Sequence, residues 1–471
     1  MVVSALRKEG GRGEDGLPGV LDRLKAQFGD RMSQGAEIRR QHANTTNWLP
    51  NEPADAVVFA QSTEEVADIV RLCAEARVPV IPFGTGTGLE GHVNAPLGGI
   101  SIDLSGLNRI LAVRAEDLDC TVEAGVTRHQ INDHLRDQGL FFPIDPGANA
   151  SLGGMASTRA SGTNAVRYGT MRDNVINLTA VMADGSIVRT GGRAKKSSAG
   201  YDLTRLLVGS EGTLGVITEL TLRLHGIPEA IAGGVCSFPT VEDACNATIL
   251  TIQSGIPVAR IELLDTLMVR ATNDFAKLGL KETPHLFVEF HGSSASVKEQ
   301  SELFGEIAAS LGGGEFVWAT RPEDRSKLWH ARHEAYFAAK GLRAGASVVA
   351  TDACVPISRL ADCVAETTAD IEQSGLIAPI VGHVGDGNFH VQLLIDIENA
   401  QEVAAAEHFV GRLNERAIAM EGTCTGEHGI GQGKRKYMKL EHPSGLPIMR
   451  AIKQALDPLG ILNPGKIFPD P

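Results

Sequence analysis

Long apolar runs, basic runs and paired cysteines are all missing from this chain of 471 residues. No stretch approaches the roughly 18 uninterrupted apolar residues of a membrane-spanning helix, so no transmembrane segment is expected. Because there is no long basic run and the formal net charge is −13, no nucleic-acid partner is expected either. The first residues carry no apolar stretch of signal-peptide length, and we interpret them as a flexible N-terminus.

The seven cysteines are scattered, odd in number and without a CxxC pair. Such usage favours a reducing compartment over a framework of disulfides. The sequence therefore predicts a cytoplasmic protein, and it leaves open a peripheral attachment to the inner membrane.

Glycine, in contrast, is abundant. The chain contains 53 glycines among its 471 residues, whereas an average protein has roughly 7%. They follow no collagen-like period and gather in clusters between ordinary strand-like and helix-like patterns. Glycine permits positive φ angles and close approach of the backbone to a ligand, so the clusters are the feature that needs a functional explanation.

The first glycine cluster covers residues 82–94, PFGTGTGLEGHVN, directly after an apolar run that predicts a strand. Small hydroxyl residues separate its glycines, so its amide N–H groups can turn toward a phosphate. No Lys-Ser/Thr pair follows, as a Walker loop requires, and Leu89 breaks the GxGxxG dinucleotide pattern. From these residues alone, an anion-binding loop and a plain tight connection both remain open.

Two more clusters follow, at residues 143–175 and 207–218. The former mixes glycine with serine, threonine and asparagine and contains a long stretch nearly free of large apolar side chains. Such a stretch cannot build a core, and it also lacks the charge of a solvated surface. We interpret it as a segment that contacts an extended polar ligand through its backbone.

In this order and spacing, the three clusters resemble the flavin domain of the vanillyl-alcohol oxidase/PCMH superfamily of FAD enzymes, over roughly residues 50–225. The match is best with its D-2-hydroxy-acid dehydrogenase branch, and within that with members that oxidise D-lactate. The resemblance implies that the first loop holds the pyrophosphate of FAD and that the other two line the flavin. The residues that it assigns to FAD are Pro82, Gly84, Thr85, Gly86, Thr87, Gly88, Pro146, Gly153, Gly154, Ser157, Gly162, Ile217 and Asn463.

The resemblance also implies that FAD is bound noncovalently. Covalently flavinylated relatives carry a histidine within the first loop, at the position that Thr87 occupies here. His92 lies further along, and we interpret it as an ordinary loop histidine.

Two strings near the C-terminus carry a second constellation, GHVGDGNFHVQLLI at residues 382–395 and TCTGEHGIGQGKRKYM at residues 423–438. His383 and His390 flank a Gly-Asp-Gly turn, a spacing that suits a hairpin with both imidazoles on one side. Glu427 and His428 add a carboxylate and another base. Two histidines and a carboxylate commonly hold a divalent metal with open positions. A lone histidine beside an apolar strand is more often structural, but the combination favours a metal site.

The same resemblance assigns His383, His390 and Glu427 as ligands of a divalent metal, either Zn, Mn or Fe. It assigns His428 as the catalytic base and Arg332, in an LWxxR pattern, as the clamp for a substrate carboxylate. The metal would chelate the carboxylate and the hydroxyl of a 2-hydroxy acid. A neutral histidine would take the hydroxyl proton, and the hydride would pass to flavin N5.

The predicted function is therefore the FAD- and metal-dependent oxidation of a D-2-hydroxy acid, with D-lactate as the first candidate. D-2-hydroxyglutarate or glycolate as substrate is one alternative, and a non-catalytic flavin-binding subunit of an oxidase complex is another. No nicotinamide site is recognised, so the expected electron acceptor is a quinone, cytochrome c or an electron-transferring flavoprotein. A homodimer is left open.

The predicted fold class is α+β. We expect an N-terminal segment (1–49), a PCMH-type FAD domain of two α/β subdomains (50–225), a substrate or cap domain with an antiparallel sheet covered by helices (226–420), and a C-terminal segment that returns to the flavin (421–471). Ser62 and Glu65 are expected to form a capping box at the start of a helix over 62–77, and Asp184-Gly185 to form a hairpin turn. Residues 216–224 alternate in a way that predicts a half-exposed strand.

Overall fold

The computed structural model describes residues 16–44, 46, 48–319 and 321–470. The flexible N-terminus expected over the first fifteen positions lies outside these residues. The chain forms two compact units. Unit 1 comprises Met1–Ala160, Thr170–Gly226 and Glu427–Pro471, and unit 2 comprises Ser161–Gly169 and Ile227–Gly426.

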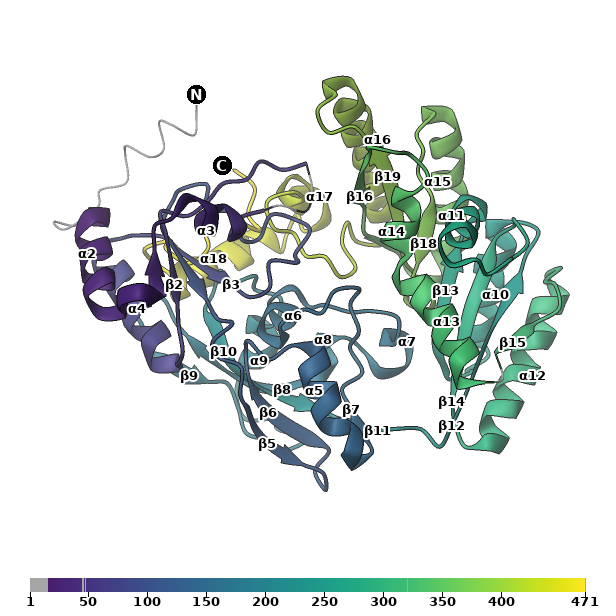
Figure 1. Cartoon of the computed structure of the whole chain (residues 1–471), viewed down its shortest axis with the longest axis horizontal. Helices are drawn as coiled ribbons and strands as arrows, with labels where there is room; N and C mark the ends of the chain where they lie inside the picture. Colours follow the sequence, from purple (N-terminus) through teal and green to yellow (C-terminus); the bar gives the residue numbers. More distant parts are fainter. Residues whose placement is uncertain (1–15, 45, 47, 320, 471) are drawn as a thin grey trace. The chain divides into compact units, whose positions relative to one another are not determined.

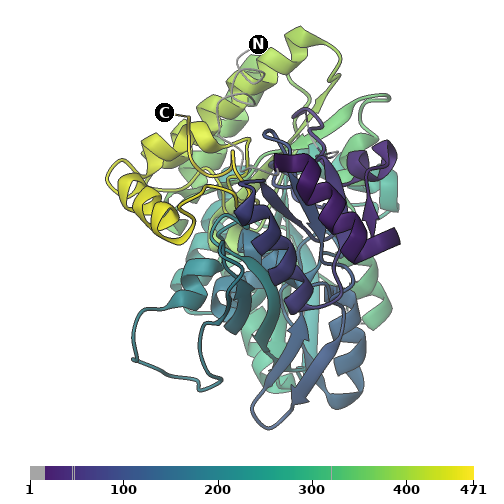
Figure 2. The ribbon, with the colours of Figure 1, turned by 90° about the vertical axis from the view of Figure 1, so that its left-hand side faces the viewer.

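A small sheet in the order β1-β2-β4-β3 forms the first part of unit 1. Strands β2, β4 and β3 are parallel, and β1 is antiparallel to β2. Helices α2 and α4 lie side by side along this sheet (Figures 1 and 2). The bounds are β1 Met32–Ser33, β2 Ala56–Phe59, β3 Val80–Phe83, β4 Ile100–Asp103, α2 Gly16–Phe28, α3 Ala36–Gln41 and α4 Thr63–Glu75.

Helix α4 begins where its sequence predicts. The Ser62 hydroxyl accepts a hydrogen bond from the amide of Glu65 at 3.2 Å, which confirms the cap. The return bond of a capping box is absent, because the Glu65 carboxylate accepts from the amide of Gln61 instead. The apolar face of the helix, which includes Val66, Ile69 and Val70, is fully buried in the core of this part of unit 1.

A five-stranded antiparallel sheet, in the order β5-β6-β10-β8-β9, forms the second part of unit 1. The predicted hairpin at Asp184-Gly185 is confirmed, since it joins β8 to β9. The prediction that residues 216–224 are half-exposed is wrong: β10 is the central strand, and both of its faces are covered. The bounds are β5 Ile110–Arg114, β6 Asp119–Glu123, β7 Leu140–Phe141, β8 Val175–Val181, β9 Ile187–Arg189, β10 Val216–Arg223, β11 His225–Gly226, α5 Arg128–Leu135, α6 Leu152–Thr158, α8 Met171–Asn174 and α9 Leu203–Leu207.

The C-terminal segment of unit 1 holds helices α17 (Met438–Glu441) and α18 (Leu446–Leu456) and then returns to β3. Val80 donates its amide to the carbonyl of Ile461, and its own carbonyl accepts from Asn463, both at 2.8 Å. Lys453, on α18, donates to the carbonyl of Thr213 at 2.7 Å. These bonds tie the end of the chain to β3, directly before the first glycine cluster, and to the third glycine cluster.

Unit 2 contains an eight-stranded antiparallel sheet in the order β15-β12-β14-β13-β18-β19-β16, with β17 paired to β19. Helices pack on it, which confirms the predicted α+β class. The strands are β12 Ala230–Ser237, β13 Val258–Leu264, β14 His285–Gly292, β15 Val317–Ala319, β16 Ser347–Ala350, β17 Ala353–Cys354, β18 Ile380–Gly382 and β19 Asn388–Ile395. The helices are α7 Ala165–Tyr168, α10 Val241–Gln253, α11 Thr266–Ala276, α12 Ser294–Ser310, α13 Pro322–His333, α14 Ala335–Lys340, α15 Leu360–Ser374 and α16 Ala400–Ala419.

Residues 161–169, which carry α7, belong to unit 2 although the flanking chain belongs to unit 1. Arg260 on β13 donates to the side-chain oxygen of Asn164 at 2.9 Å and so helps to hold this excursion. Sequence patterns gave no sign of it, because the segment is short and its partners lie far along the chain.

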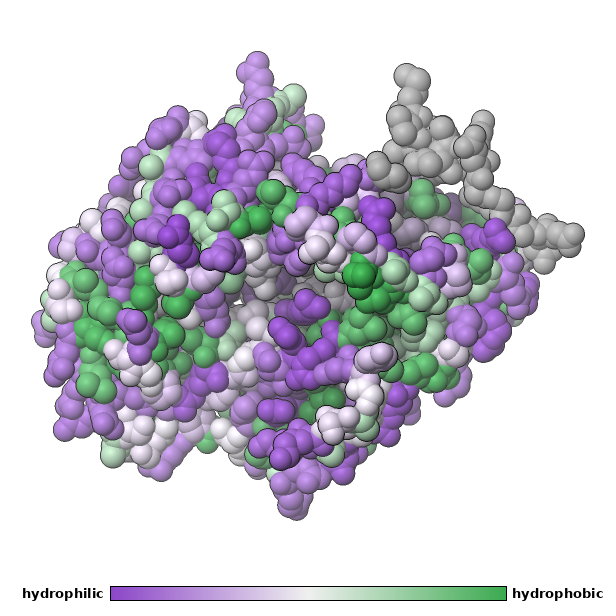
Figure 3. Space-filling model, turned by 180° about the vertical axis from the view of Figure 1, so that it is seen from behind, coloured by the Kyte–Doolittle hydropathy of each residue, from purple (hydrophilic) through white to green (hydrophobic). Residues whose placement is uncertain are grey.

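Polar side chains dominate the face of the molecule in Figure 3, and the apolar ones gather in separate small patches. Among the described residues, no helix combines the length and the apolar character needed to cross a bilayer.

Candidate functional site

The first glycine cluster of unit 1 forms a loop directly after β3. Thr85 and Thr87 are exposed on it, and their hydroxyls lie 3.2 Å apart. Gly86 has a φ of +67°, and a Cβ on Gly84 would meet the Ser151 hydroxyl at 2.3 Å. The loop therefore presents exposed hydroxyls and bare backbone, as the anion-binding interpretation requires.

The second cluster opens with helix α6, which starts at Leu152 and includes Gly153, Gly154 and Ser157. A Cβ on Gly153 would meet that of Ala124 at 2.6 Å, so glycine lets this helix lie against the end of β6. The Ser157 hydroxyl donates to the carbonyl of Gly153 at 2.8 Å. Three of the predicted flavin contacts in this cluster, Gly153, Gly154 and Ser157, thus lie on one short helix.

The remaining residues assigned to FAD are spread over both units. Pro82 and Pro146 are half-buried in unit 1, and Ile217 is buried on β10. Gly162 belongs to the excursion in unit 2. Asn463 donates to the carbonyls of Glu211 and His92, at 2.7 and 3.1 Å.

Three buried polar atoms of unit 1 fit a bound polar cofactor. The hydroxyls of Ser151 and Ser210 and the side-chain oxygen of Asn463 are buried and have no hydrogen-bond partner within the protein. Unsatisfied buried groups are uncommon, and each needs an explanation. All three belong to the glycine-rich loops or to the segment that returns to them, which is where FAD is predicted.

In unit 2, His383 and His390 come together as the hairpin interpretation predicts. Strand β18 ends just before His383, a short 3-10 turn (Val384–Asp386) follows, and His390 lies on β19. The two imidazole centroids are 5.3 Å apart and the rings are nearly perpendicular, at 84°.

A buried glutamate that sequence patterns missed lies behind His383. Glu262, on the neighbouring strand β13, is fully buried, and its carboxylate oxygens are 2.9 and 3.0 Å from Nδ1 of His383. Its carboxylate also accepts a short hydrogen bond from Arg332. Burial opposes ionisation, but the neighbouring His383 and Arg332 hold the pKa of the Glu262 carboxyl below its ordinary value.

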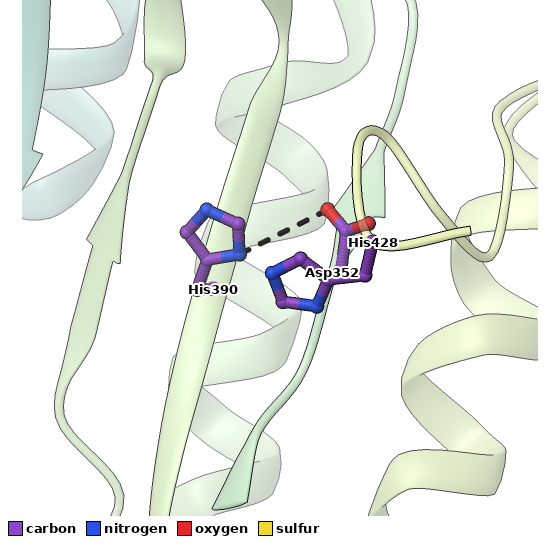
Figure 4. A group of neighbouring side chains, drawn as sticks. All are labelled: Asp352, His390 and His428. Atoms are coloured by element: carbon purple, nitrogen blue, oxygen red, sulfur yellow. Dashed lines mark ion pairs between the residues drawn. The ribbon is translucent and has the colours of Figure 1, made fainter. Parts of the chain in front are cut away.

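His390 has its own supporting group. Its Nδ1 donates to the carbonyl of Thr351 at 2.9 Å and forms an ion pair with Asp352 at 3.8 Å (Figure 4). Asp352 is fully buried and also accepts from the side chains of Asn388 and Thr425, both at 2.7 Å. Asp352, like Glu262, was not recognised from the sequence, since neither carboxylate belongs to a local motif.

Glu427 and His428 open the C-terminal segment of unit 1, immediately after Gly426, the last residue of unit 2. The loop that carries them is fastened to other parts of unit 1. The carbonyl of Glu90 accepts from the amide of Gln432 at 2.7 Å, and the carboxylate of Glu90 pairs with Lys434 at 3.3 Å.

Comparison with known families gives two matches. A family described as "FAD binding domain" matches residues 54–191, and one described as "FAD linked oxidases, C-terminal domain" matches residues 227–467. This chain belongs to the FAD-linked oxidases. The predicted superfamily and its FAD cofactor are thereby confirmed.

Relatives of this FAD-linked oxidase are similar over almost its whole length. It is 50% identical to "Probable D-lactate dehydrogenase, mitochondrial" of Danio rerio, covering 95% of this chain and 91% of the relative. It is 44% identical to "D-lactate dehydrogenase [cytochrome], mitochondrial" of Arabidopsis thaliana, covering 96% and 80% respectively.

Solved structures share the fold of this FAD-linked oxidase at lower identity. A substrate-bound p-cresol methylhydroxylase matches with a TM-score of 0.79 and 18% identity, covering 98% of both chains. An alkyldihydroxyacetonephosphate synthase matches with a TM-score of 0.73 and 19% identity, covering 95% of this chain and 84% of the other. These similarities confirm the PCMH-type architecture.

Proposed function

We propose that this FAD-linked oxidase dehydrogenates a D-2-hydroxy acid to the 2-oxo acid, with D-lactate as substrate, pyruvate as product and noncovalently bound FAD as the first electron acceptor. The observation that carries the proposal is the pair of half-buried His383 and buried His390, each supported by its own hydrogen-bond acceptor. Flavin binding alone gives no reason for two oriented imidazoles in unit 2.

The donor set fits a divalent metal. Nδ1 of His383 is engaged by Glu262 and that of His390 by Thr351, so Nε2 is the atom by which each ring would hold a metal. A carboxylate or carbonyl behind Nδ1 fixes the tautomer and raises the basicity of the opposite nitrogen, an arrangement typical of metal-binding histidines. When bound, the metal would supply Lewis-acid polarisation of the substrate oxygens.

We assign Glu427 as the third ligand and His428 as the base. Chain connectivity supports this: a Cβ on Gly426 would approach Asp352 at 3.2 Å and the Asn388 side chain at 2.4 Å, within unit 2. Glu427 is the next residue, and consecutive Cα atoms are about 3.8 Å apart. A neutral imidazole at His428 would accept the proton of the substrate hydroxyl while FAD, when bound, accepts the hydride.

Arg332 remains our candidate for binding the substrate carboxylate. It is buried, and it already pairs with Glu262 on the side of His383. A guanidinium has five N–H donors, so the contact with Glu262 orients it and leaves donors for a second carboxylate.

The choice of D-lactate rests on the two D-lactate dehydrogenases to which this chain is similar and on Ser347. Ser347 is half-buried and carries no charge that could bind a second substrate carboxylate. D-2-hydroxyglutarate and glycolate are the alternative substrates. The electron acceptor is proposed to be a quinone, cytochrome c or an electron-transferring flavoprotein.

Anaerobic reduction of the purified holoenzyme tests the proposal. D-lactate is expected to bleach the flavin, and preincubation with a chelator is expected to prevent it, with activity restored by a divalent metal. Bleaching by D-2-hydroxyglutarate or glycolate but not by D-lactate would correct the substrate. A flavin that none of these acids reduces would refute the proposed function.

A further inference from the structure

Glu211 connects the third glycine cluster to the loop that carries His428, and no motif assigns it a role. Its two carboxylate oxygens accept hydrogen bonds from the amides of Ile430 and Gly431, at 2.6 and 2.7 Å. Both amides follow closely after His428, and all of these residues belong to unit 1. One side chain therefore holds the backbone next to the proposed base.

The carboxylate is buried and ionised. Glu211 is only 6% exposed, and its second oxygen is 3.4 Å from Nε2 of His92, which is also buried. Although burial opposes ionisation, His92 and the two backbone amides hold the pKa of the Glu211 carboxyl below its ordinary value. His92, expected to be an ordinary loop histidine, thus comes from the first glycine cluster to share this carboxylate.

Glycines on two loops pack directly against Glu211 and His92. A Cβ on Gly429 would lie 2.8 Å from both the Glu211 carboxylate and Nε2 of His92. A Cβ on Gly88 would meet the other nitrogen of His92 at the same distance. The imidazole is therefore enclosed between the first loop and the loop of His428.

The backbone of Glu211 adds an independent observation. Its φ is +53°, a left-handed conformation that glycine adopts without strain, and it stands between Gly209 and Gly212, which also have positive φ. Glutamate at such a position is strained, because its Cβ crowds the backbone in the left-handed region. The turn alone would favour glycine, so the side chain is what the position requires.

Glu211 also touches the predicted flavin segments through its backbone. Its amide donates to the carbonyl of Ser157 at 2.9 Å, and its carbonyl accepts from Asn463 at 2.7 Å. Both residues are assigned to FAD. A single residue is thus bonded to two flavin-lining segments through its main chain and to the His428 loop through its side chain.

We propose that Glu211, with the imidazole of His92 beside it, is a positioning residue that fixes the loop of His428 against the flavin-binding loops. This inference rests on the proposed function, because it gives His428 the role of base. Its effect is geometric: proton removal and hydride transfer need the base and the flavin at a fixed separation, and a displacement of about 1 Å can slow such a reaction about 100-fold.

The test compares the holoenzyme with Glu211→Gln, which keeps the size of the side chain but offers one acceptor to two amides. Hydrogen exchange of the Ile430 and Gly431 amides is expected to accelerate by about 10-fold or more. The limiting rate of flavin reduction by D-lactate is expected to fall about 10- to 100-fold. The concentration of D-lactate at half-maximal rate, the FAD content and the rate of reduction by dithionite are expected to stay near those of the wild type.

Glu219→Gln is the matched control, since Glu219 lies on β10 and accepts a hydrogen bond from the Thr179 hydroxyl at 3.1 Å. This variant should leave the hydrogen exchange of the two amides and the limiting rate of flavin reduction unchanged. If Glu211→Gln does not fold, Glu211→Asp is the second variant: it keeps the charge beside His92 but is too short to reach both amides. For Glu211→Asp, too, we expect faster hydrogen exchange of the two amides and slower reduction of the flavin by D-lactate.

Three results would overturn the inference. In the first, the Ile430 and Gly431 amides of Glu211→Gln exchange as slowly as in the wild type. In the second, these amides exchange faster but D-lactate reduces the flavin at an unchanged rate. In the third, the variant loses FAD, and the flavin that remains is reduced at the normal rate. If no D-2-hydroxy acid reduces even the wild-type flavin, the proposed function fails instead. Amide exchange would then still decide whether Glu211 holds this loop.

Discussion

Glu262 and His383 form a buried carboxylate–imidazole pair, with Nδ1 of the ring 2.9 Å from one carboxylate oxygen and 3.0 Å from the other. An ionised carboxylate can only accept hydrogen bonds, so the ring must carry a proton on Nδ1, and in the neutral imidazole Nε2 is then the nitrogen with the free lone pair. The same carboxylate accepts from Arg332. One side chain from β13 therefore sets the orientation of a predicted metal ligand and of the predicted substrate clamp.

Replacing Glu262 should weaken metal binding. Glu262→Gln is expected to lower the affinity for added Zn²⁺ or Mn²⁺ by about 10- to 100-fold, because the charge that raises the basicity of His383 is lost. Equilibrium dialysis with elemental analysis measures this directly, without reference to turnover.

Glu289→Gln is the control for that experiment. Glu289 is a buried carboxylate on the adjacent strand β14, and it faces Arg260, Arg325 and His291 rather than His383. Glu289→Gln should lower the stability of the protein as Glu262→Gln does, but it should leave the metal affinity unchanged. Equal loss of metal in the two variants would show that a general loosening of unit 2 is responsible.

His383→Ala should abolish metal binding and turnover while FAD stays bound. Removing a ligand has a larger effect than removing its supporting group, so the fall in D-lactate turnover should be about 100-fold or more. His285→Ala is its control, because His285 is another buried histidine of unit 2 and bonds to the carbonyl of Thr283. Full activity in His383→Ala would rule out the metal site.

Gly153→Ala should release FAD. Its new methyl group would lie 2.6 Å from the Cβ of Ala124 and 3.0 Å from the Ala124 carbonyl, so the first turn of α6 must move away from the end of β6. Gly192→Ala adds the same methyl group where nothing lies within 4 Å. The absorbance ratio of flavin to protein after gel filtration distinguishes the two. A normal ratio in Gly153→Ala would mean that α6 does not shape the FAD site.

Asp265→Asn should stabilise the protein at neutral pH. Asp265 caps α11, accepting from the amide of Met268 at 2.7 Å, and burial raises the pKa of its carboxyl to about 6. A raised folded-state pKa means that the stabilising contribution is complete below the unfolded value of 3.8 and is lost as the pH rises through 6. Asparagine caps a helix equally well, so the free energy of unfolding should rise by about 1–3 kcal/mol at pH 8.

Urea unfolding at pH 8 and pH 5 measures that gain, which should shrink at the lower pH as the wild-type carboxyl becomes protonated. Asp202→Asn is the control, since Asp202 caps α9 in an exposed position and its pKa is lowered by hydrogen bonds to Arg205. Asp202→Asn should not raise the free energy of unfolding. A stabilisation of Asp265→Asn that is independent of pH would contradict the explanation.

The parts of the fold that the sequence predicts are those governed by local interactions. Ser62 lies a few residues from the amide that it caps, and the turn at Asp184-Gly185 needs no distant partner. The hairpin that brings His383 and His390 together is local as well. Burial of β10 was predicted wrongly because it depends on β6 and β8, which are distant in the chain.

The sequence by itself therefore determined where the backbone must approach a ligand, because the glycine clusters are visible in the composition. It also determined which side chains carry the proposed chemistry. Only the tertiary structure decided which carboxylates support them. Glu262, Asp352 and Glu211 are single acidic residues without a local pattern. Each becomes significant only because folding buries its charge beside a histidine or a pair of amides, where an ionised carboxylate must be compensated.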